Sequence, residues 1–197
     1  MRILIVGGPG TIGREVVKAL TSGNEVIQAS RSHSPIKVDI TDPASIRAMY
    51  KNVGKVDAII SAAGSGAWKP LSELTDEDFQ SSLKNKLMGQ ANLVRYGFDN
   101  LTDHGSITVT SGVLSQKPMV GSGAISLLNS GLEGFVRAAA LEAPRGIRVN
   151  VVSPPWVSET LKEMGQDPSH GLPAATVARS YVDSVKGKQT GKVIEPK

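Results

Sequence analysis

Three glycines stand at regular spacing near the start of the chain, in the segment GGPGTIG that follows the apolar run RILIV. Their arrangement is Gly7-x-x-Gly10-x-x-Gly13, and the residues after them have helical character. Glycines at a strand-to-helix turn let the backbone approach a pyrophosphate, and the free N–H groups of the helix N-terminus attract the anion. The pattern predicts a phosphate-binding turn that includes Thr11 and Ile12, with a plain glycine-rich turn as the alternative.

An arginine follows the second apolar run, where a dinucleotide-binding chain distinguishes between its two cofactors. An NAD-binding turn is normally followed, roughly twenty residues on, by an acid that binds the ribose 2′-hydroxyl. Here the run ends in QASRSHS, which has no acid and places Arg31 between Ser30 and Ser32. Because a guanidinium offers a planar fork of donors to a phosphate, the segment favours NADP(H) over NAD(H). An ordinary exposed loop arginine is the alternative.

Short apolar runs alternate with helical stretches along the whole chain, and these elements must position the residues above. The runs predict buried strands at 2–6, 25–29, 36–40, 57–61, 106–110, 148–152 and 192–196. Helices are predicted at 12–21, 43–52, 76–101, 122–143 and 174–186. The alternation predicts a single α/β domain over 1–197, a Rossmann-type doubly wound parallel sheet of about seven strands.

The connection SRSHSP between the second and third predicted strands is unusually short. Parallel neighbours normally need a crossover of about a dozen residues. Either these two strands are not adjacent and parallel, or the crossover helix is missing. We adopt the second interpretation.

Composition excludes several classes of protein. The chain has no cysteine, and its three histidines, His33, His104 and His170, lie far apart, so neither a disulfide nor a metal site is expected. The net charge is +4, but the basic residues are scattered and aromatics make up only 4%, which argues against nucleic-acid binding. The opening MRILIVGG is too short for a signal-peptide core and no later segment is long enough to span a membrane, so we expect a cytoplasmic protein.

Several segments resemble the short-chain dehydrogenase/reductase family, over nearly the whole chain. SAAG at 61–64 is similar to the family's Asn-Asn-Ala-Gly, VDITD at 38–42 to its Asp-Val-Thr-Asp segment, and GIRVNVVSPPWV at 146–157 to its Gly-Ile-Arg-Val-Asn segment. LPAATVARSYVDSV and QTGKVI resemble its last helix and strand. The resemblance implies an oxidoreductase with a small-molecule substrate and a small substrate lobe at about 155–173. The family normally has a helix between its second and third strands, and this chain is expected to lack it.

The cofactor-binding positions follow from the glycine turn, from Arg31 and from the resemblance, which also implies that Asp39 contacts the adenine. The expected set is Gly7, Gly10, Thr11, Ile12, Gly13, Ser30, Arg31, Asp39, Ile40, Ser61, Ala62, Ala63, Gly64, Asn129, Pro154 and Val157.

The resemblance fails at the catalytic residues. The family has a Ser after its fifth strand and a Tyr-x-x-x-Lys on the next long helix, where the Lys lowers the phenol pKa. Ser111 matches the Ser, but Ile125 and Asn129 stand at the Tyr and Lys positions. On the preceding helix the family has an Asn, where this chain has Lys86, with Asn85 one residue away.

Two main hypotheses follow. In the first, Lys86 and Asn129 exchange roles, Ser111 and Lys86 are catalytic, and the protein reduces a small carbonyl or activated double bond with a proton from water, Ser111 or His170. In the second, the protein binds NADP(H) without catalysis, as a redox sensor or regulatory protein, because losing general acid help costs roughly 10²–10⁴-fold in rate. A structural interaction module with an empty cleft is a third possibility.

A ridge of small residues recurs every four positions along the helix predicted at 122–143. It consists of Ser122, Ser126, Ser130, Gly134 and Ala138. Such a ridge lets a second helix approach closely. The family commonly dimerises through this helix and the one before it, so a homodimer through 76–101 and 122–143 is expected. The alternative is that the ridge packs on the sheet.

Overall fold

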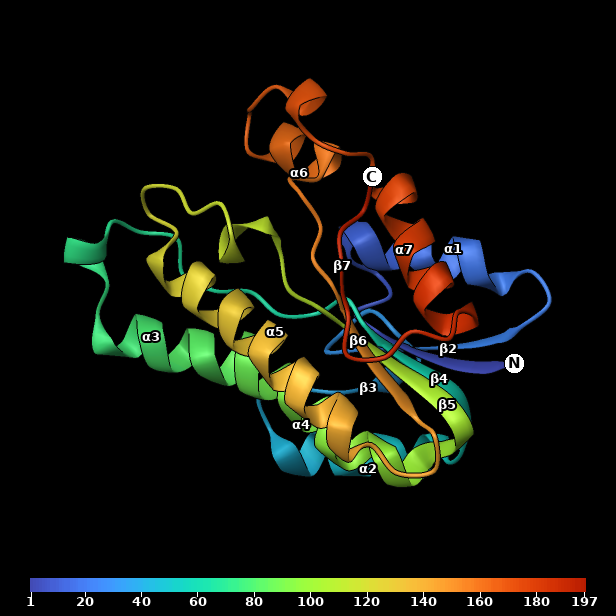
Figure 1. Cartoon of the computed structure of the whole chain (residues 1–197). Helices are drawn as coiled ribbons and strands as arrows, with labels where there is room; N and C mark the ends of the chain where they lie inside the picture. The colour runs from blue at the N-terminus through green and yellow to red at the C-terminus, as the bar shows by residue number, and fades with distance from the viewer.

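The computed structural model, which describes all 197 residues, contains one seven-stranded parallel sheet with helices on both faces (Figure 1). The strands are β1 Arg2–Val6, β2 Glu25–Ser30, β3 Ile36–Lys37, β4 Val56–Ser61, β5 Leu101–Thr110, β6 Arg148–Val152 and β7 Val193–Ile194, in the order β3-β2-β1-β4-β5-β6-β7. The helices are α1 Thr11–Thr21, α2 Pro43–Val53, α3 Asp76–Ser82, α4 Gly89–Gly97, α5 Gly123–Glu142, α6 Ser158–Glu163 and α7 Ala174–Lys186. The predicted fold class is confirmed.

Alternate residues of β1 contribute to two separate cores, because successive side chains of a strand point to opposite faces. Ile3 and Ile5 pack with α1 and α7, whereas Leu4 and Val6 pack with α2, α4 and α5. Figure 1 shows the two groups of helices on opposite sides of the sheet. The connections after β1 and β4 therefore leave toward opposite faces, which opens a crevice at the carboxyl edge of the sheet between them.

The missing crossover helix is confirmed, and the structure explains how so short a connection works. β2 and β3 are parallel neighbours, and only residues 31–35 join them. The pairing is limited to Ala29 with Ile36 and Ser30 with Lys37, at the carboxyl end of β2. Because β3 begins level with the end of β2, the chain does not travel back along the sheet and needs no helix to do so.

The helix predicted at 76–101 is divided into several segments. It consists of α3, a π-helical segment Leu83–Met88, α4 and a 3-10 turn Phe98–Asn100. β5 then begins at Leu101, five residues earlier than predicted, and its register with β4 shifts between Val56 and Ala58. The edge strands β3 and β7 are shorter than predicted, with two residues each.

Helix α5 packs on the sheet through large side chains rather than through its small ones. Leu128, Leu132 and Val136 are fully buried, whereas Ser130 and Gly134 on the small-residue ridge are exposed. The alternative in which the ridge packs on the sheet is therefore wrong for the C-terminal half of α5. Neither α5 nor any other helix has the length and apolar character needed to cross a membrane.

A small lobe stands above the carboxyl edge of the sheet, between β6 and α7 (Figure 1). It contains α6 and a 3-10 turn Pro168–His170. A parallel bridge between Val157 and Leu172 joins the two ends of this lobe. The lobe therefore borders the crevice without belonging to either helical layer.

Candidate functional site

The glycine turn connects β1 to α1 in a conformation that only glycine fits. Gly7 has φ +87°, and a Cβ there would lie 2.8 Å from the carbonyl oxygen of Ala62. A Cβ on Gly13 would collide with the carbonyl of Gly7. These glycines therefore bring α1 close to the ends of β1 and β4.

The N-terminus of α1 carries free hydrogen-bond donors. Gly10 is the N-cap and has no side chain to cap the helix. The first backbone bond into the helix runs from the N–H of Arg14 to the carbonyl of Gly10, so the N–H groups of Thr11, Ile12 and Gly13 have no acceptor in the protein. Such a helix terminus is suited to an anion.

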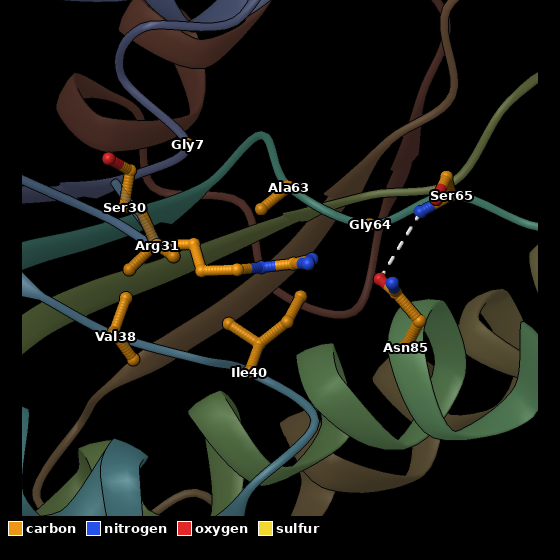
Figure 2. A pocket seen from close by; sticks show the side chains of 10 residues that line it. Gly7, Ser30, Arg31, Val38, Ile40, Ala63, Gly64, Ser65 and Asn85 are labelled. Carbon is orange, nitrogen blue, oxygen red and sulfur yellow. Dashed lines mark hydrogen bonds between the residues drawn. The ribbon is translucent and has the colours of Figure 1, made fainter. Parts of the chain in front are cut away.

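A cavity of about 280 Å³ lies at the carboxyl ends of β1 and β2 (Figure 2). Its lining residues are Val6, Gly7, Ser30, Arg31, Val38, Ile40, Ala63, Gly64, Ser65 and Asn85. The side chain of Arg31 extends across it, above Ile40 and toward Ala63. No hydrogen bond or salt bridge engages its guanidinium, which is therefore available to a ligand.

Ten predicted cofactor positions do not line this cavity. Four belong to the glycine turn described above (Gly10, Thr11, Ile12 and Gly13), and three line a second cavity described below (Asn129, Pro154 and Val157). The other three, Asp39, Ser61 and Ala62, lie at the edge of the sheet. The Asp39 carboxylate accepts hydrogen bonds from the backbone N–H and the hydroxyl of Thr41, at 2.9 and 2.8 Å, and these bonds lower the pKa of Asp39. Ser61 is fully buried at the end of β4, and its hydroxyl has no partner. The backbone N–H of Ala62 donates to Val6. These residues shape the edge of the sheet beneath the cavity rather than line it.

A second cavity, of about 420 Å³, meets the first at Gly64. It is lined by Gly64, Trp68, Lys86, Ser111, Gly112, Val113, Leu114, Ile125, Asn129, Pro154, Pro155, Trp156, Val157, Thr160 and Met164. Both cavities lie at the carboxyl edge of the sheet and share Gly64 as a lining residue. The structure thus joins the predicted cofactor residues to the predicted catalytic pair, Ser111 and Lys86.

Lys86 lies on the π-helical segment and is the only charged residue that lines the second cavity. Its Nζ donates to the backbone carbonyl of Ser111 at 3.2 Å and has no other acceptor, which leaves two N–H bonds for a ligand. Desolvation lowers the pKa of Lys86 to about 8. Single π turns in helices are frequent at functional sites.

The neighbouring Asn85 has a different position. It lines the first cavity, where its Oδ1 accepts from the N–H of Ser65 at 3.4 Å (Figure 2). It does not line the second cavity, so it does not restore the family's Asn there. The π-helical segment thus places two consecutive side chains in two parts of one site.

Ser111 is buried, and its hydroxyl is engaged by a carboxylate that the sequence analysis did not identify. Glu133 is 4% exposed, and its Oε1 accepts from the hydroxyls of Ser111, Ser115 and Ser153 at 2.9, 2.7 and 3.2 Å. Its position carried a signal, because Asn129 and Glu133 are four residues apart and share a helix face. The Ser111 hydroxyl donates to Glu133, so only its lone pairs remain for a ligand.

Asn129 and Ile125 lie side by side on the wall of the second cavity that α5 provides. The Asn129 amide donates through Nδ2 to the carbonyl of Gly112 at 3.1 Å, next to the carbonyl that Lys86 contacts. Its Oδ1 is buried without a partner. At the position of the family's Lys, Asn129 thus offers a free acceptor instead of an ammonium. At the position of the family's Tyr, Ile125 offers an aliphatic side chain instead of a phenol.

None of the three tyrosines reaches this cavity. Tyr50 donates to the carbonyl of Leu93 inside the core, and Tyr181 shares a hydrogen bond with Thr110 beneath the sheet. Burial raises the pKa of both phenols. Tyr96 stacks with two arginines on the α2–α4 surface. His170, one of the predicted proton sources, is exposed on the lobe and does not line the cavity.

Comparison with known proteins identifies the family. A family model described as enoyl-(acyl carrier protein) reductase matches residues 13–192. Short-chain dehydrogenase/reductase ATR9 of Stachybotrys chlorohalonatus is 33% identical over 94% of this chain and 83% of its own length. The crystal structure of protein lin1944 from Listeria innocua is 43% identical with a TM-score of 0.95, covering 99% of this chain and 98% of that chain. The chain belongs to the short-chain dehydrogenase/reductase family and is an oxidoreductase of that type.

A further similar structure contains a bound cofactor. A small-chain dehydrogenase in complex with NADPH is 25% identical with a TM-score of 0.88, covering 99% of this chain and 95% of that chain. The residues of this chain fit a nicotinamide dinucleotide on three grounds: the free N–H groups of α1, the unengaged Arg31 and the unpartnered Asn129 Oδ1. The first two suit phosphates and the third suits a hydroxyl or amide donor.

Proposed function

We propose that the protein is an NADP(H)-dependent oxidoreductase that reduces a small carbonyl compound or an activated double bond. The observation that carries the proposal is that the two cavities adjoin at Gly64, with Arg31 lining the first and Lys86 lining the second. Arg31 would hold the 2′-phosphate of a dinucleotide bound along this edge, and Lys86 would lie in the cavity where the dinucleotide supplies its hydride. The lobe at about 155–173 then covers the substrate.

Each residue has a role that follows from its contacts. Gly7, Gly10 and the α1 N–H groups bind the pyrophosphate, and Ser30 and Arg31 bind the 2′-phosphate. Asn129 accepts a hydrogen bond through its free Oδ1. The bound dinucleotide supplies a hydride. Two of the proton sources considered from the sequence do not fit, because the Ser111 hydroxyl already donates to Glu133 and His170 does not line the cavity. We therefore assign the proton to Lys86, whose ammonium lies against the substrate oxygen and donates it there.

The exchange of roles between Lys86 and Asn129 is supported by their contacts. They bond to the consecutive carbonyls of Ser111 and Gly112, at 3.2 and 3.1 Å. An ammonium on one helix therefore lies beside an amide on the other. If Lys86→Ala still oxidised NADPH with a carbonyl substrate at the wild-type rate, the exchange of roles would be wrong.

Thermal unfolding with NADPH, NADP+, NADH and NAD+ tests cofactor binding. A ligand at a hundred times its dissociation constant stabilises the fold by about 2.7 kcal/mol, a shift of roughly 5–10 °C for a domain of this size. We expect the shift with the phosphorylated pair only. No shift with any of the four contradicts the proposal, and a shift with the unphosphorylated pair alone contradicts the role of Arg31.

A second candidate is a non-catalytic NADP(H)-binding sensor or regulatory protein. The absence of a phenol from the second cavity favours it. The two functions differ in turnover, since a sensor binds NADPH without oxidising it across a broad panel of carbonyls and enones. Oxidation of NADPH with any member of that panel excludes the sensor.

We further propose a homodimer through α4 and α5. Leu127 and Leu141 on α5 are exposed, and a Cβ at Gly134 between them would meet no other atom within 4 Å. A second copy of the same face would cover these side chains. Light scattering of the wild type and of Gly134→Gln measures the mass directly: we expect a dimer and a monomer, respectively. A monomeric wild type contradicts the proposal.

A further inference from the structure

The two tryptophans of the chain stand together at the second cavity. Trp68 follows β4 and Trp156 follows β6, and their ring centroids are 5.7 Å apart with 58° between the planes. Trp68 is 40% exposed, and no hydrogen bond involves its indole N–H. Exposed aromatic side chains grouped at a cavity offer a large apolar surface to a flat ligand.

Trp68 is held in place by the loop opposite it. The backbone N–H of Lys69 donates to the carbonyl of Gly121 at 3.1 Å, and a Cβ on Gly121 would lie 2.8 Å from the Trp68 Nε1. Gly121 has φ +86°, a conformation that favours glycine. The ring is therefore packed against backbone on one side and open to the cavity on the other.

Hydrocarbon side chains make up much of the rest of the cavity, and its polar side chains are few. Val113, Leu114, Ile125, Pro155 and Met164 line it with hydrocarbon, and Lys86 is the one charged group. Of the uncharged polar side chains, Ser111 already donates its hydroxyl proton to Glu133, and Asn129 donates to the carbonyl of Gly112 and offers its acceptor Oδ1. This leaves the Thr160 hydroxyl as the one uncommitted donor among them. A ligand that matches this lining is flat and apolar and carries an oxygen that accepts from the Lys86 ammonium.

The missing phenol restricts the chemistry of that oxygen. Hydride addition to a simple ketone leaves an alkoxide, a strong base that needs a proton donor placed directly on it. Hydride addition to a quinone leaves a phenolate, whose conjugate acid has a pKa of about 10 in a simple phenol. An ammonium in a desolvated site stabilises such an anion electrostatically and protonates it without a tyrosine.

We propose that the second cavity binds a flat conjugated carbonyl compound of the quinone type, with its ring against Trp68 and Trp156 and one oxygen on Lys86. This inference rests on the proposed function and names its substrate class. In balanced form, one quinone, one NADPH and one proton give one hydroquinone and one NADP+. Lys86 delivers the proton and recovers it from solvent.

Tryptophan fluorescence measures binding without the cofactor, because every tryptophan of the chain lines this cavity. The probe is 1,4-naphthoquinone, and 2-decalone is the saturated bicyclic control. We expect saturable quenching by the quinone beyond that of free N-acetyltryptophanamide, and none by the decalone. The chain has no cysteine, so the quinone does not add to a thiol. Quenching that never saturates overturns the inference.

Steady-state oxidation of NADPH tests the same preference in catalysis. We expect kcat/KM for 1,4-naphthoquinone to exceed that for 2-decalone by about 100-fold or more, following the general acid contribution. Trp68→Leu raises KM for the quinone by about 2- to 12-fold, the amount of an aromatic pair. Leu71→Ala, an exposed change on the same loop outside the cavity, leaves KM unchanged.

The outcomes separate this inference from the function it rests on. Turnover of 2-decalone equal to that of the quinone, or an unchanged KM in Trp68→Leu, overturns the quinone assignment and leaves the oxidoreductase standing. NADPH binding without oxidation by any carbonyl in the panel overturns the proposed function, and the substrate class with it.

Discussion

The two ends of the site differ in what holds them together. At the proposed dinucleotide end, which comprises the glycine turn and the first cavity, the important groups are backbone N–H donors, close approaches of glycines and the unengaged guanidinium of Arg31. At the proposed reaction end, which is the second cavity and its surroundings, the important groups are side chains from three different segments, among them Lys86, Ser111 and Glu133. Backbone geometry tolerates many sequences, whereas acid–base chemistry depends on which side chain is present. The dinucleotide end therefore keeps the family's pattern while the reaction end has changed.

The largest expected effect is at the dinucleotide end. Gly7→Ala places a Cβ at φ +87° and 2.8 Å from the carbonyl oxygen of Ala62, so the turn must shift. We expect the stabilisation by NADPH, roughly 5–10 °C, to be lost. Thermal unfolding measures this, and the transition without ligand shows whether the variant folds.

The matched control is Gly23→Ala, a loop position with φ +77° where a Cβ meets nothing within 4 Å and which lines neither cavity. This substitution costs about 1–2 kcal/mol of stability through its left-handed backbone and keeps the NADPH shift. An intact shift in Gly7→Ala would mean that the turn does not contact the cofactor.

At the reaction end, Lys86 carries the next largest effect. Lys86→Met removes the ammonium and lowers kcat by about 10²–10³-fold, as for the loss of one donor to an oxyanion, while the NADPH shift remains. The pKa of Lys86 is about 8, so wild-type kcat is flat below that pH and falls above it as the ammonium loses its proton. Steady-state assays of NADPH oxidation from pH 6 to 10 measure this dependence of kcat on pH.

Lys86→Arg tests whether the decline of kcat above pH 8 is due to deprotonation of Lys86. A guanidinium stays protonated, so the decline above pH 8 disappears from the variant's profile whatever its absolute rate. A decline that persists in Lys86→Arg assigns the titration to another group and contradicts the role of Lys86 as the acid.

Arg31 has an intermediate effect, confined to the choice of cofactor. Arg31→Ala removes the donors available to a 2′-phosphate and weakens NADPH binding by about 10- to 100-fold, with NADH unchanged. Isothermal titration of both cofactors measures the ratio. Arg179→Ala, an exposed substitution on α7 away from both cavities, leaves the ratio as in the wild type. Equal weakening of NADH would mean that Arg31 does not distinguish the cofactors.

The smallest effect is expected at Glu133, which acts through Ser111. Glu133→Ala leaves three serine hydroxyls without their acceptor and lowers the free energy of unfolding by about 1–3 kcal/mol. Glu133→Gln keeps an acceptor oxygen at the same place, so we expect a smaller decrease in the free energy of unfolding. Chemical denaturation measures both, and identical losses in the two variants would show that the serine bonds contribute nothing.

Much of the dinucleotide end could be predicted from the sequence because its signals are local. The glycine turn, the strand before it and the helix after it lie within residues 2–21, and Arg31 follows the next strand directly. The missing crossover was visible as a connection too short for a helix. The contacts of Asp39 could not be predicted in the same way: its carboxylate bonds to Thr41, two residues on, and its neighbours Val38 and Ile40 line the cavity instead.

Less of the reaction end could be predicted. The π-helical segment adds a backbone residue to a turn that looks regularly helical in sequence, and it directs Asn85 and Lys86 into different cavities. Trp68 was not recognised as a pocket residue, because its partner Trp156 is 88 positions away. Glu133 was visible only as a charge on a helix until Ser111, Ser115 and Ser153 converged on it.

The sequence by itself determined the parallel sheet, the phosphate turn and the absence of the family's Tyr and Lys, because each depends on residue types at short spacing. The sequence also named Lys86 and Ser111 as candidates, but only the tertiary structure decided that they line one cavity together with the two tryptophans. The ends of β4, β5 and β6 must meet at one edge before Trp68, Ser111 and Trp156 share a cavity with Lys86. That meeting depends on long-range packing, which no local pattern specifies.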